Sequence, residues 1–314
     1  MMGRQAAPAI SVIVATRNRQ AALGNFLDAL RALPDDPAWE LIVVNNGSTD
    51  GTEELLSAAS ADLPILSVYE ERPGKSRALN RALARAKGEL LLFTDDDVVP
   101  EQRWLTALYH ASLDFPDANV FGGKIVVNQD KIPRWIAGSY NLKTILVSEQ
   151  DLGPAICRFA HDQYPMGPNL AVRRRLVEQG SVSWPVNLGP GTKIPVGDER
   201  AFLVQISPPH LRDRLYVPQS VVLHNVGVRG LNIKSAVARC FLGGFSAGLV
   251  RRVYGHCRPR RRPGAARLAL QRLRRASSVP ELICIVARTL GVAAGMVSPL
   301  PRIVFGSNDK PCRE

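Results

Sequence analysis

The chain has 314 residues, of which 46% are hydrophobic and 22% are charged. These proportions exclude a chain that is disordered throughout, and the length suffices for one large domain or for one domain with an appendage. The net charge of +12 is concentrated near the end: from Arg229 onward, 17 Lys and Arg residues stand against three acidic residues, which gives that part +14 and the rest −2. Such a basic tail suits an anionic partner, either phospholipid or nucleic acid.

The first 127 residues alternate short apolar runs with helical patterns. Four buried strands are expected, at residues 10–15, 41–44, 65–69 and 90–94. Three amphipathic helices are expected between them, at residues 23–33, 52–59 and 76–87. Repeated strand–helix–strand units predict an α/β fold, a mostly parallel sheet with helices on both faces.

Each of the four strands is followed by a polar loop. In chain order the loops contain TRNR, NNGSTDG, ERPGKSR and DDD. Ligands of such sheets bind at the carboxyl ends of the strands. The four loops are therefore predicted to line one crevice, and their convergence is a stronger signal than any one of the motifs.

The chain from residue 128 onward is less regular. Residues 128–165 are interrupted by proline and glycine, and residues 166–180 have the pattern of a loop that leads into a helix. A loop rich in glycine and proline follows at 184–197, and a further strand is expected at 215–223.

The basic tail contains a helical pattern at 233–253, a basic stretch at 258–275 and an apolar run at 282–300 that holds Arg288. A transmembrane helix needs about 20 predominantly apolar residues, and a central arginine costs about 2.5 kcal/mol or more. We therefore expect a helix pair that lies on an anionic membrane surface rather than a span. The alternative is a basic helical appendage packed on the rest of the chain. Nucleic acid is not expected as the partner, because the tail lacks interleaved aromatic residues and any zinc or helix-turn-helix signature.

The compartment is expected to be the cytoplasm. The five cysteines are scattered and show neither metal-ligand spacing nor a disulfide framework, which favours a reducing environment. The apolar run before Arg17 is too short for the core of a signal peptide. Together with the tail, these features predict a protein held peripherally on the inner face of the membrane.

Three consecutive carboxylates, Asp95, Asp96 and Asp97, end the fourth predicted strand. They would repel one another unless a positive group neutralised them. Alternate carboxylates around a short turn can reach one hard cation, and Mg²⁺ or Mn²⁺ prefers such oxygen ligands. A solvated acidic turn, or Asp97 as a helix cap, is the alternative, and the position at a strand end weighs against it.

In the order VIVATRNR, ELIVVNNGSTDGT, RPGKSRALNRAL, GELLLFTDDDVVP and GPNLAVRR, followed by a later pair of acids, the sequence resembles the family-2 inverting glycosyltransferases of GT-A fold. The resemblance covers about residues 9–230. It implies a domain at 1–230, with a nucleotide-binding half at about 9–127 and an acceptor half at 128–230, while 231–314 forms the basic helical appendage.

The resemblance implies roles for residues of the strand-end loops. The groups that would bind the nucleotide diphosphate-sugar donor are Thr16, Arg17, Asn18, Asn45, Lys75, Arg77, Asp95 and Asp96. Within the acidic run, Asp95 would approach the ribose and Asp97 would bind the metal, while no separate role follows for Asp96.

Asn45 departs from the family pattern, which commonly has aspartate at this position. An amide both donates and accepts hydrogen bonds, whereas a carboxylate only accepts. Uridine is therefore not to be assumed as the base of the donor. A tight turn at Asn45-Asn46-Gly47 is the structural alternative.

Asp198 and Glu199 follow the flexible loop at 184–197 and open a short apolar pattern. Inverting transfer needs a base that removes the proton of the acceptor hydroxyl. By position in the family, Glu199 would be that base and Asp198 its neighbour, although the order of the two acids is swapped here and leaves their roles exchangeable. The alternative is that both only favour a helix N-terminus.

Four further residues are candidates for the site. His224, at the end of the predicted strand 215–223, is a candidate metal ligand or diphosphate contact, and equally a structural histidine. Gly167 and Asn169 resemble the family's turn beneath the sugar and acceptor. Trp184 is a candidate for stacking on a sugar ring, with burial in the core as the alternative.

These features predict a metal-dependent inverting glycosyltransferase that acts on a lipid-linked or polysaccharide acceptor. Two other classes remain open: a sugar nucleotidyltransferase on a similar sheet, and a non-catalytic module that binds a nucleotide-sugar. A nucleotidyltransferase usually has a glycine-rich loop after the first strand, and TRNRQ contains no glycine.

Overall fold

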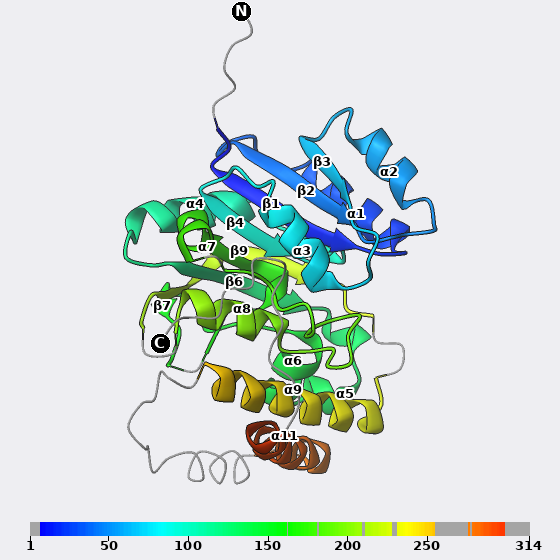
Figure 1. Cartoon of the computed structure of the whole chain (residues 1–314), viewed down its shortest axis with the longest axis vertical. Helices are drawn as coiled ribbons and strands as arrows, with labels where there is room; N and C mark the ends of the chain where they lie inside the picture. Colours follow the sequence, from blue (N-terminus) through cyan, green and yellow to red (C-terminus); the bar gives the residue numbers. More distant parts are fainter. Residues whose placement is uncertain are drawn as a thin grey trace, which may run out of the picture.

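The computed structural model describes residues 7–161, 163–180, 182–208, 211–227, 231–254, 276 and 278–298. Their centre is one mixed sheet with the strand order β3-β2-β1-β4-β8-β6-β9-β5, in which β7 also pairs with β9. The strands are β1 (Ile10–Thr16), β2 (Trp39–Asn45), β3 (Ile65–Tyr69), β4 (Leu90–Thr94), β5 (Val98–Pro100), β6 (Val120–Val127), β7 (Cys157–Arg158), β8 (Leu170–Arg173) and β9 (Arg214–His224). Figure 1 shows the sheet running through the upper and middle parts of the molecule.

The α-helices in the described residues differ in length from 4 to 21 residues. They are α1 (Gln20–Leu30), α2 (Thr52–Ala59), α3 (Lys75–Leu83), α4 (Trp104–Asp114), α5 (Arg134–Ala137), α6 (Tyr140–Val147), α7 (Arg174–Gly180), α8 (Asp198–Ile206), α9 (Ile233–Val253) and α11 (Val279–Val297). Short 3₁₀ turns lie at Gln129–Lys131 and Gly167–Asn169.

The parallel sheet predicted from the first 127 residues is confirmed for β3, β2, β1 and β4. Beyond β4 the sheet is mixed, because β8 is antiparallel to both β4 and β6. The interpretation of residues 166–180 as a loop and a helix missed β8, a strand of only four residues. The chain direction reverses at β8. β8 can therefore pair directly with β4 without the crossover connection that neighbouring parallel strands need.

Two apolar layers sandwich the sheet. Side chains of α1, α2 and α4 pack on one face with Val12, Val14 and Val43 of the strands, and side chains of α3, α7 and α8 pack on the other with Ile13 and Ile42. Successive strand residues point to opposite faces, so apolar residues at every position bury both sides. Both faces of the sheet are therefore closed, and ligand access is left to the strand ends.

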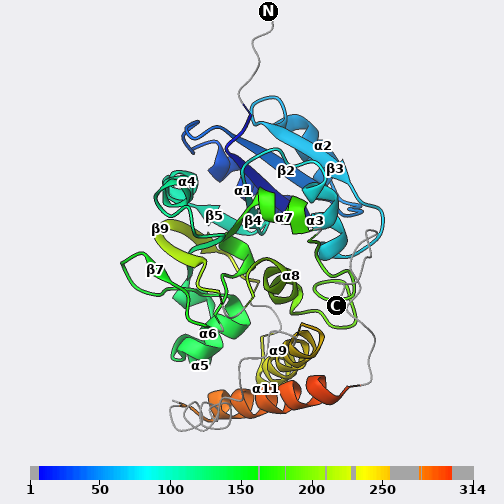
Figure 2. The same cartoon turned by 60° about the vertical axis from the view of Figure 1, so that its left-hand side comes forward.

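The last two described helices form a separate layer beside α8, α6 and α5, as Figure 2 shows. The predicted helix at 233–253 coincides with α9, and the apolar run at 282–300 corresponds to α11. By length and composition both helices could cross a membrane, with 44% and 33% of their most apolar windows buried within the molecule. The basic stretch at 258–275 lies outside the described residues.

Candidate active site

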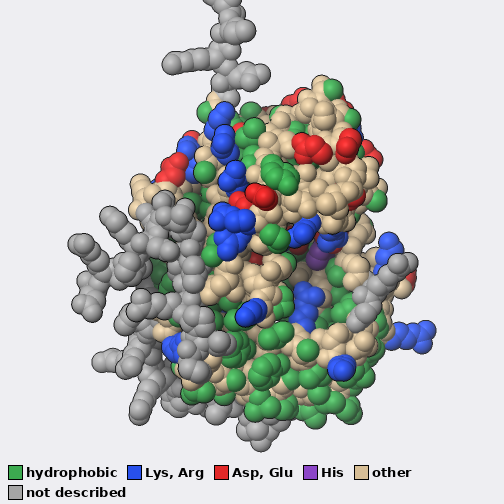
Figure 3. All heavy atoms as spheres, turned by 45° about the vertical axis from the view of Figure 1, so that its right-hand side comes forward, with side chains coloured by type: hydrophobic (Ala, Val, Ile, Leu, Met, Phe, Trp, Pro, Cys, Tyr) green, Lys and Arg blue, Asp and Glu red, His purple; other side chains and the backbone are tan. Residues whose placement is uncertain are grey.

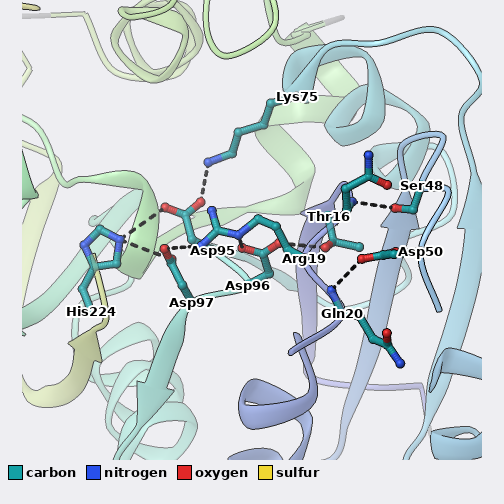
Figure 4. A network of polar contacts seen from close by, with 11 residues as sticks. Thr16, Arg19, Gln20, Ser48, Asp50, Lys75, Asp95, Asp96, Asp97 and His224 are labelled. Atoms are coloured by element: carbon teal, nitrogen blue, oxygen red, sulfur yellow. Dashed lines mark hydrogen bonds and ion pairs between the residues drawn. The ribbon is translucent and has the colours of Figure 1, made fainter. Parts of the chain in front are cut away.

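Three potential metal ligands meet at the carboxyl ends of β4 and β9. Asp95 and Asp97 follow β4, and His224 is the last residue of β9. His224 is paired with Val98 in the β5–β9 ladder, so the register of the sheet sets the imidazole beside the acidic turn. One ligand atom from each of Asp95, Asp97 and His224 lies within 4.8 Å of the others. Figure 4 shows the two carboxylates turned toward the ring.

The donor set of this cluster fits a hard divalent cation. His224 Nε2 lies 3.3 Å from Asp97 Oδ1 and 4.0 Å from Asp95 Oδ2, and its Nδ1 faces the Val147 carbonyl at 3.1 Å. Asp97 Oδ1 is buried and has no hydrogen-bond partner of proper geometry among the described residues. A buried, unsatisfied carboxylate oxygen is costly unless a ligand completes it. Two carboxylates and an imidazole ring held by a backbone carbonyl are a common arrangement at metal sites.

The three groups polarise one another. Burial works against ionisation of Asp97, but His224 and Arg19 outweigh it and lower the pKa of the carboxyl. Burial likewise opposes a charged His224, while the carboxylates of Asp97 and Asp95 raise the pKa of the ring. Arg19 and a charged His224 thus partly balance the carboxylates, and a cation that binds the ring nitrogen would take the place of its proton.

Arg19 belongs to this network, although the sequence analysis did not select it. Its guanidinium lies 2.6 Å from Asp97 Oδ2 and 3.2 Å from Asp96 Oδ1 (Figure 4). Asn18 has a left-handed backbone with φ of 52°, and its side chain accepts a hydrogen bond from the Thr49 N–H at 2.7 Å. This turn directs the next residue over the acidic run. Arg19 is the last residue of the TRNR motif. Treating all four residues of that motif as candidate site residues would have included Arg19.

Asp96 is buried and forms a hydrogen bond that links two strand ends. Its carboxylate accepts a hydrogen bond from Thr16 Oγ1 at 2.7 Å, and the residue is 4% exposed. Burial raises the pKa of Asp96 to about 6, with Arg19 and Thr16 opposing the rise. Thr16 and Asp96 therefore tie the ends of β1 and β4 together. The Thr16 hydroxyl and one Asp96 carboxylate oxygen are engaged with each other, and their predicted contact with the donor stays a prediction.

Lys75 connects the acidic run to the second pair of acids. Its ammonium forms an ion pair with Asp95, and both side chains are mostly buried. Burial alone would lower the pKa of Lys75, but Asp95, Glu199 and Asp198 together raise it well above its usual range. Lys75 is therefore a permanent positive charge between the two acidic clusters.

The loop at 184–197 is held against the start of α3. Lys75 N donates to the Pro190 carbonyl at 3.2 Å, and Ser76 Oγ donates to the Leu188 carbonyl at 3.1 Å. Gly197, with φ of 94°, then turns the chain into α8, whose first two residues are Asp198 and Glu199. The positive φ favours glycine. The loop thus places both acids next to Lys75.

Asp198 and Glu199 have different surroundings. Asp198 is 5% exposed, and burial raises the pKa of its carboxyl while Lys75 opposes the rise. Glu199 is partly exposed, and burial together with Asp198 raises its pKa to about 7. A carboxyl group with a pKa near neutrality is suited to accept a proton and release it again. Of the two acids, Glu199 has the access and the pKa for this task.

Comparisons with known proteins identify the family to which this chain belongs. The profile described as "Glycosyl transferase family 2" matches residues 11–179, more than half of the chain. The chain belongs to glycosyl transferase family 2. The match includes the acidic run, Lys75 and Gly167, and it ends before Asp198, Glu199 and His224.

Individual relatives of this family-2 glycosyltransferase match it over shorter stretches. Glucosyl-3-phosphoglycerate synthase of Mycolicibacterium paratuberculosis is 36% identical over 94 residues, which are 29% of each chain. The probable glycosyltransferase YdaM of Bacillus subtilis is 29% identical over 182 residues, 55% of this chain and 42% of YdaM. The chain thus spans less than half the length of either relative.

A solved structure extends the likeness to the whole fold. The mannosyltransferase PcManGT from Pyrobaculum calidifontis, solved in complex with GDP-Man and Mn²⁺, aligns with a TM-score of 0.60 and 21% identity, over 94% of this chain and 88% of that chain. This confirms the predicted GT-A fold for the family-2 glycosyltransferase described here.

The remaining donor candidates lie around the rim of the crevice. Arg17 and Asn18 are exposed at the end of β1, and Arg77 is half-buried on α3. Asn45 is 2% exposed; its amide oxygen accepts from Ser48 N at 2.9 Å, and its amide nitrogen donates to Glu53 Oε2 at 2.8 Å. The turn predicted as the alternative for Asn45 is therefore present. The side-chain amide oxygen of Asn45 already accepts a hydrogen bond within this turn.

Two of the predicted acceptor residues, Trp184 and Asn169, are buried in this structure. Trp184 is 1% exposed, stacks on Phe202 at 4.3 Å between ring centroids and meets Phe93 edge-on at 5.1 Å, so neither face can receive a sugar. Asn169 is fully buried, where its side chain bonds Trp104 Nε1 at 3.0 Å and the carbonyl of Ser220 at 3.0 Å. Trp184 is in the core because burial of its large apolar ring is favourable. Asn169 can be buried there because its amide forms hydrogen bonds with protein groups.

Gly167 lies directly under Glu199. A Cβ at this position would overlap the Glu199 carboxylate, and the backbone of Gly167 forms a hydrogen bond with that carboxylate. Gly167 therefore helps to fix the position of Glu199, and its predicted contact with the acceptor stays a prediction.

Gly167→Ala is predicted to lower kcat about 100-fold, because a displacement of roughly 1 Å in a reacting group costs that much. Initial-rate kinetics together with circular dichroism would test it. Gly24→Ala on α1 is the control, since a Cβ there meets only Leu55 at 3.9 Å, an ordinary contact. Equal rates for both variants would remove Gly167 from the site.

Proposed function

We propose that this chain is a metal-dependent inverting glycosyltransferase that moves a sugar from a nucleotide diphosphate-sugar to a hydroxyl group of a lipid-linked or polysaccharide acceptor. One observation carries the proposal: Lys75 pairs with Asp95 of the Asp95–Asp97–His224 cluster and is close enough to Asp198 and Glu199 for their charges to raise its pKa. A centre that can hold a metal and a proton acceptor near neutrality are the two parts that inverting transfer requires.

Asp95, Asp97 and His224 would hold Mg²⁺ or Mn²⁺. The unsatisfied Asp97 Oδ1 and the hard oxygen donors support this assignment. When bound, the ion supplies positive charge that stabilises the departing diphosphate. Arg19 and Lys75 flank the same carboxylates, so two fixed cations of the chain add to that stabilisation.

Glu199 would remove the proton of the acceptor hydroxyl as that oxygen attacks the sugar carbon. Its partly exposed carboxylate sits over Gly167, and its pKa of about 7 makes it a base at neutral pH. Asp198 is the more buried neighbour, and its charge helps to keep the pKa of Glu199 high.

The acceptor half and the tail carry the second part of the proposal. We divide the chain at residue 230 into the transferase domain and a basic helical appendage that associates peripherally with the inner face of the membrane from the cytoplasm. The net charge of +14 from Arg229 onward and the two long apolar helices support this placement. A lipid-linked acceptor would then be met where it resides.

The test is incubation of the purified chain with Mn²⁺ or Mg²⁺ and a panel of nucleotide-sugars that includes GDP-mannose, because PcManGT was solved with that donor, and UDP-sugars. Release of free nucleoside diphosphate with sugar transfer or donor hydrolysis is the expected result. Pyrophosphate as the product would instead identify a sugar nucleotidyltransferase. A metal-dependent rise in thermal stability with nucleotide, but no turnover over long incubation, would identify a non-catalytic binding module.

A further inference from the structure

The outward face of α11 is apolar along its whole length. Its exposed large side chains recur at helical spacing and point away from the protein. They are Val279, Leu282, Ile283, Val286, Leu290, Met296 and Val297, which are 39% to 81% exposed. The two charged residues of α11 lie elsewhere: Glu281 is buried, and the guanidinium of Arg288 lies against Gly243 of α9. Figure 3 shows hydrophobic side chains gathered at the end of the molecule formed by these helices.

The opposite face of α11 is fixed to the protein. Gly291 and Gly295 of α11 face Gly244 and Gly248 of α9 so closely that a Cβ at any of them would overlap the partner backbone. Small residues spaced four apart permit this approach of two helices. At the start of α11, Asn141 of α6 donates a hydrogen bond to the Glu281 carboxylate at 2.8 Å. The apolar face is therefore held in one orientation.

The helix pair is also joined to the catalytic helix. Gly197, which directly precedes α8, packs against Ser246 of α9 at a distance that leaves no room for a Cβ. Leu249 and Val250 of α9 bury their side chains against α8 residues Ala201 and Val204. A surface that docks on α11 would thus be separated from the Asp198–Glu199 pair by the thickness of two helices.

The chain between the two helices supplies a matching charge. Eight arginines and no acidic residue occur between residues 254 and 278, which follow α9 and precede α11 in the chain. An anionic lipid surface offers both an apolar interior for the face of α11 and negative headgroups for the arginines. A protein partner would need a long apolar groove ringed by acids to match the same two features.

We propose that the outward face of α11 is a membrane-docking surface that sinks into an anionic phospholipid leaflet with the helix axis parallel to the bilayer. This inference rests on the proposed function, since it identifies the surface by which the transferase reaches a membrane. A spanning orientation is disfavoured, because α9 packs on α8 and α6 while α11 packs on α9 and α6. The docked helix fixes the distance and the tilt of the crevice relative to the lipid.

The experiment is flotation of the full chain with phosphatidylcholine vesicles that contain, or lack, phosphatidylglycerol. The chain is expected to float with the mixed vesicles. Leu290→Asp is expected to lower the partition coefficient about tenfold or more, because it removes a large side chain from the lipid and adds a charge there. The matched control is Leu113→Asp on α4, since Leu113 is 58% and Leu290 60% exposed. The control is expected to bind like the unaltered chain.

Two results would overturn the proposal. One is equal binding of Leu290→Asp and the unaltered chain. The other is a lipid-free dimer, seen by light scattering, that Leu290→Asp dissociates, because a second copy would then cover the face. Measuring donor hydrolysis in the absence of vesicles tests the proposed transferase activity independently of membrane docking. Vesicle binding without any turnover would refute the transferase alone, and turnover that persists without vesicle binding would refute the docking surface alone.

Discussion

Glu199→Gln is expected to reduce the rate of sugar transfer about 1,000-fold while donor binding remains. The amide keeps the size of the side chain but cannot accept the acceptor's proton, and general-base catalysis contributes roughly 10²–10⁴ in rate. The carboxylate of Glu199 is the partly exposed member of the acidic pair and lies against Gly167. Transfer kinetics and the nucleotide-induced shift in the unfolding midpoint would separate chemistry from binding.

The same residue predicts the pH dependence of the reaction. The base must be ionised, and its pKa is raised to about 7, so kcat should rise tenfold per pH unit below about 7 and level off above it. Glu199→Gln should abolish this limb of the profile. An unchanged limb in the variant would assign it to another group.

Two further variants test whether Glu199 is the base. Glu54→Gln removes an exposed carboxylate on α2, remote from the crevice, and is expected to leave the rate unaltered. Asp198→Asn tests the exchange of roles that the swapped order of the acids leaves open. A larger loss for Asp198→Asn than for Glu199→Gln would make Asp198 the base.

The first four strands of the fold could be predicted because local patterns determine them. Each of the first four strands is an apolar run bounded by a polar loop, and parallel strands with crossover helices leave few arrangements. The placement of Asp95 and Asp97 follows from that topology alone. The approach of His224 does not, because it depends on the pairing of Val98 with His224 between strands more than 100 residues apart in the chain.

The part of the chain after residue 127 was harder to predict for physical reasons. Four residues are too few to show the alternation of a strand, which hid β8. Trp184 and Asn169 occur in sequence contexts rich in glycine and proline that suggest exposed loops, yet tertiary packing buries both. Arg19 was missed because its role requires the left-handed turn at Asn18, a backbone feature that sequence spacing does not reveal.

Asp97→Ala is expected to abolish metal-stimulated turnover, with a loss of at least about 1,000-fold. Asp97 supplies the buried oxygen that lacks a hydrogen-bond partner and lies 3.3 Å from His224, so its removal takes away a central donor of the proposed cation site. A ligand at 100 times its Kd stabilises the folded state by about 2.7 kcal/mol. The rise in unfolding midpoint that Mn²⁺ with nucleoside diphosphate gives the unaltered chain should therefore disappear in the variant.

A carboxylate outside the crevice provides the control for Asp97. Asp114 at the end of α4 is exposed, and Asp114→Ala should retain both turnover and the Mn²⁺-dependent stabilisation. Turnover by Asp97→Ala at the unaltered rate in the presence of a chelator would refute metal dependence. A normal stabilisation by Mn²⁺ with lost turnover would keep the metal site but move its ligands to Asp95 and His224, leaving Asp97 to hold Arg19 in place.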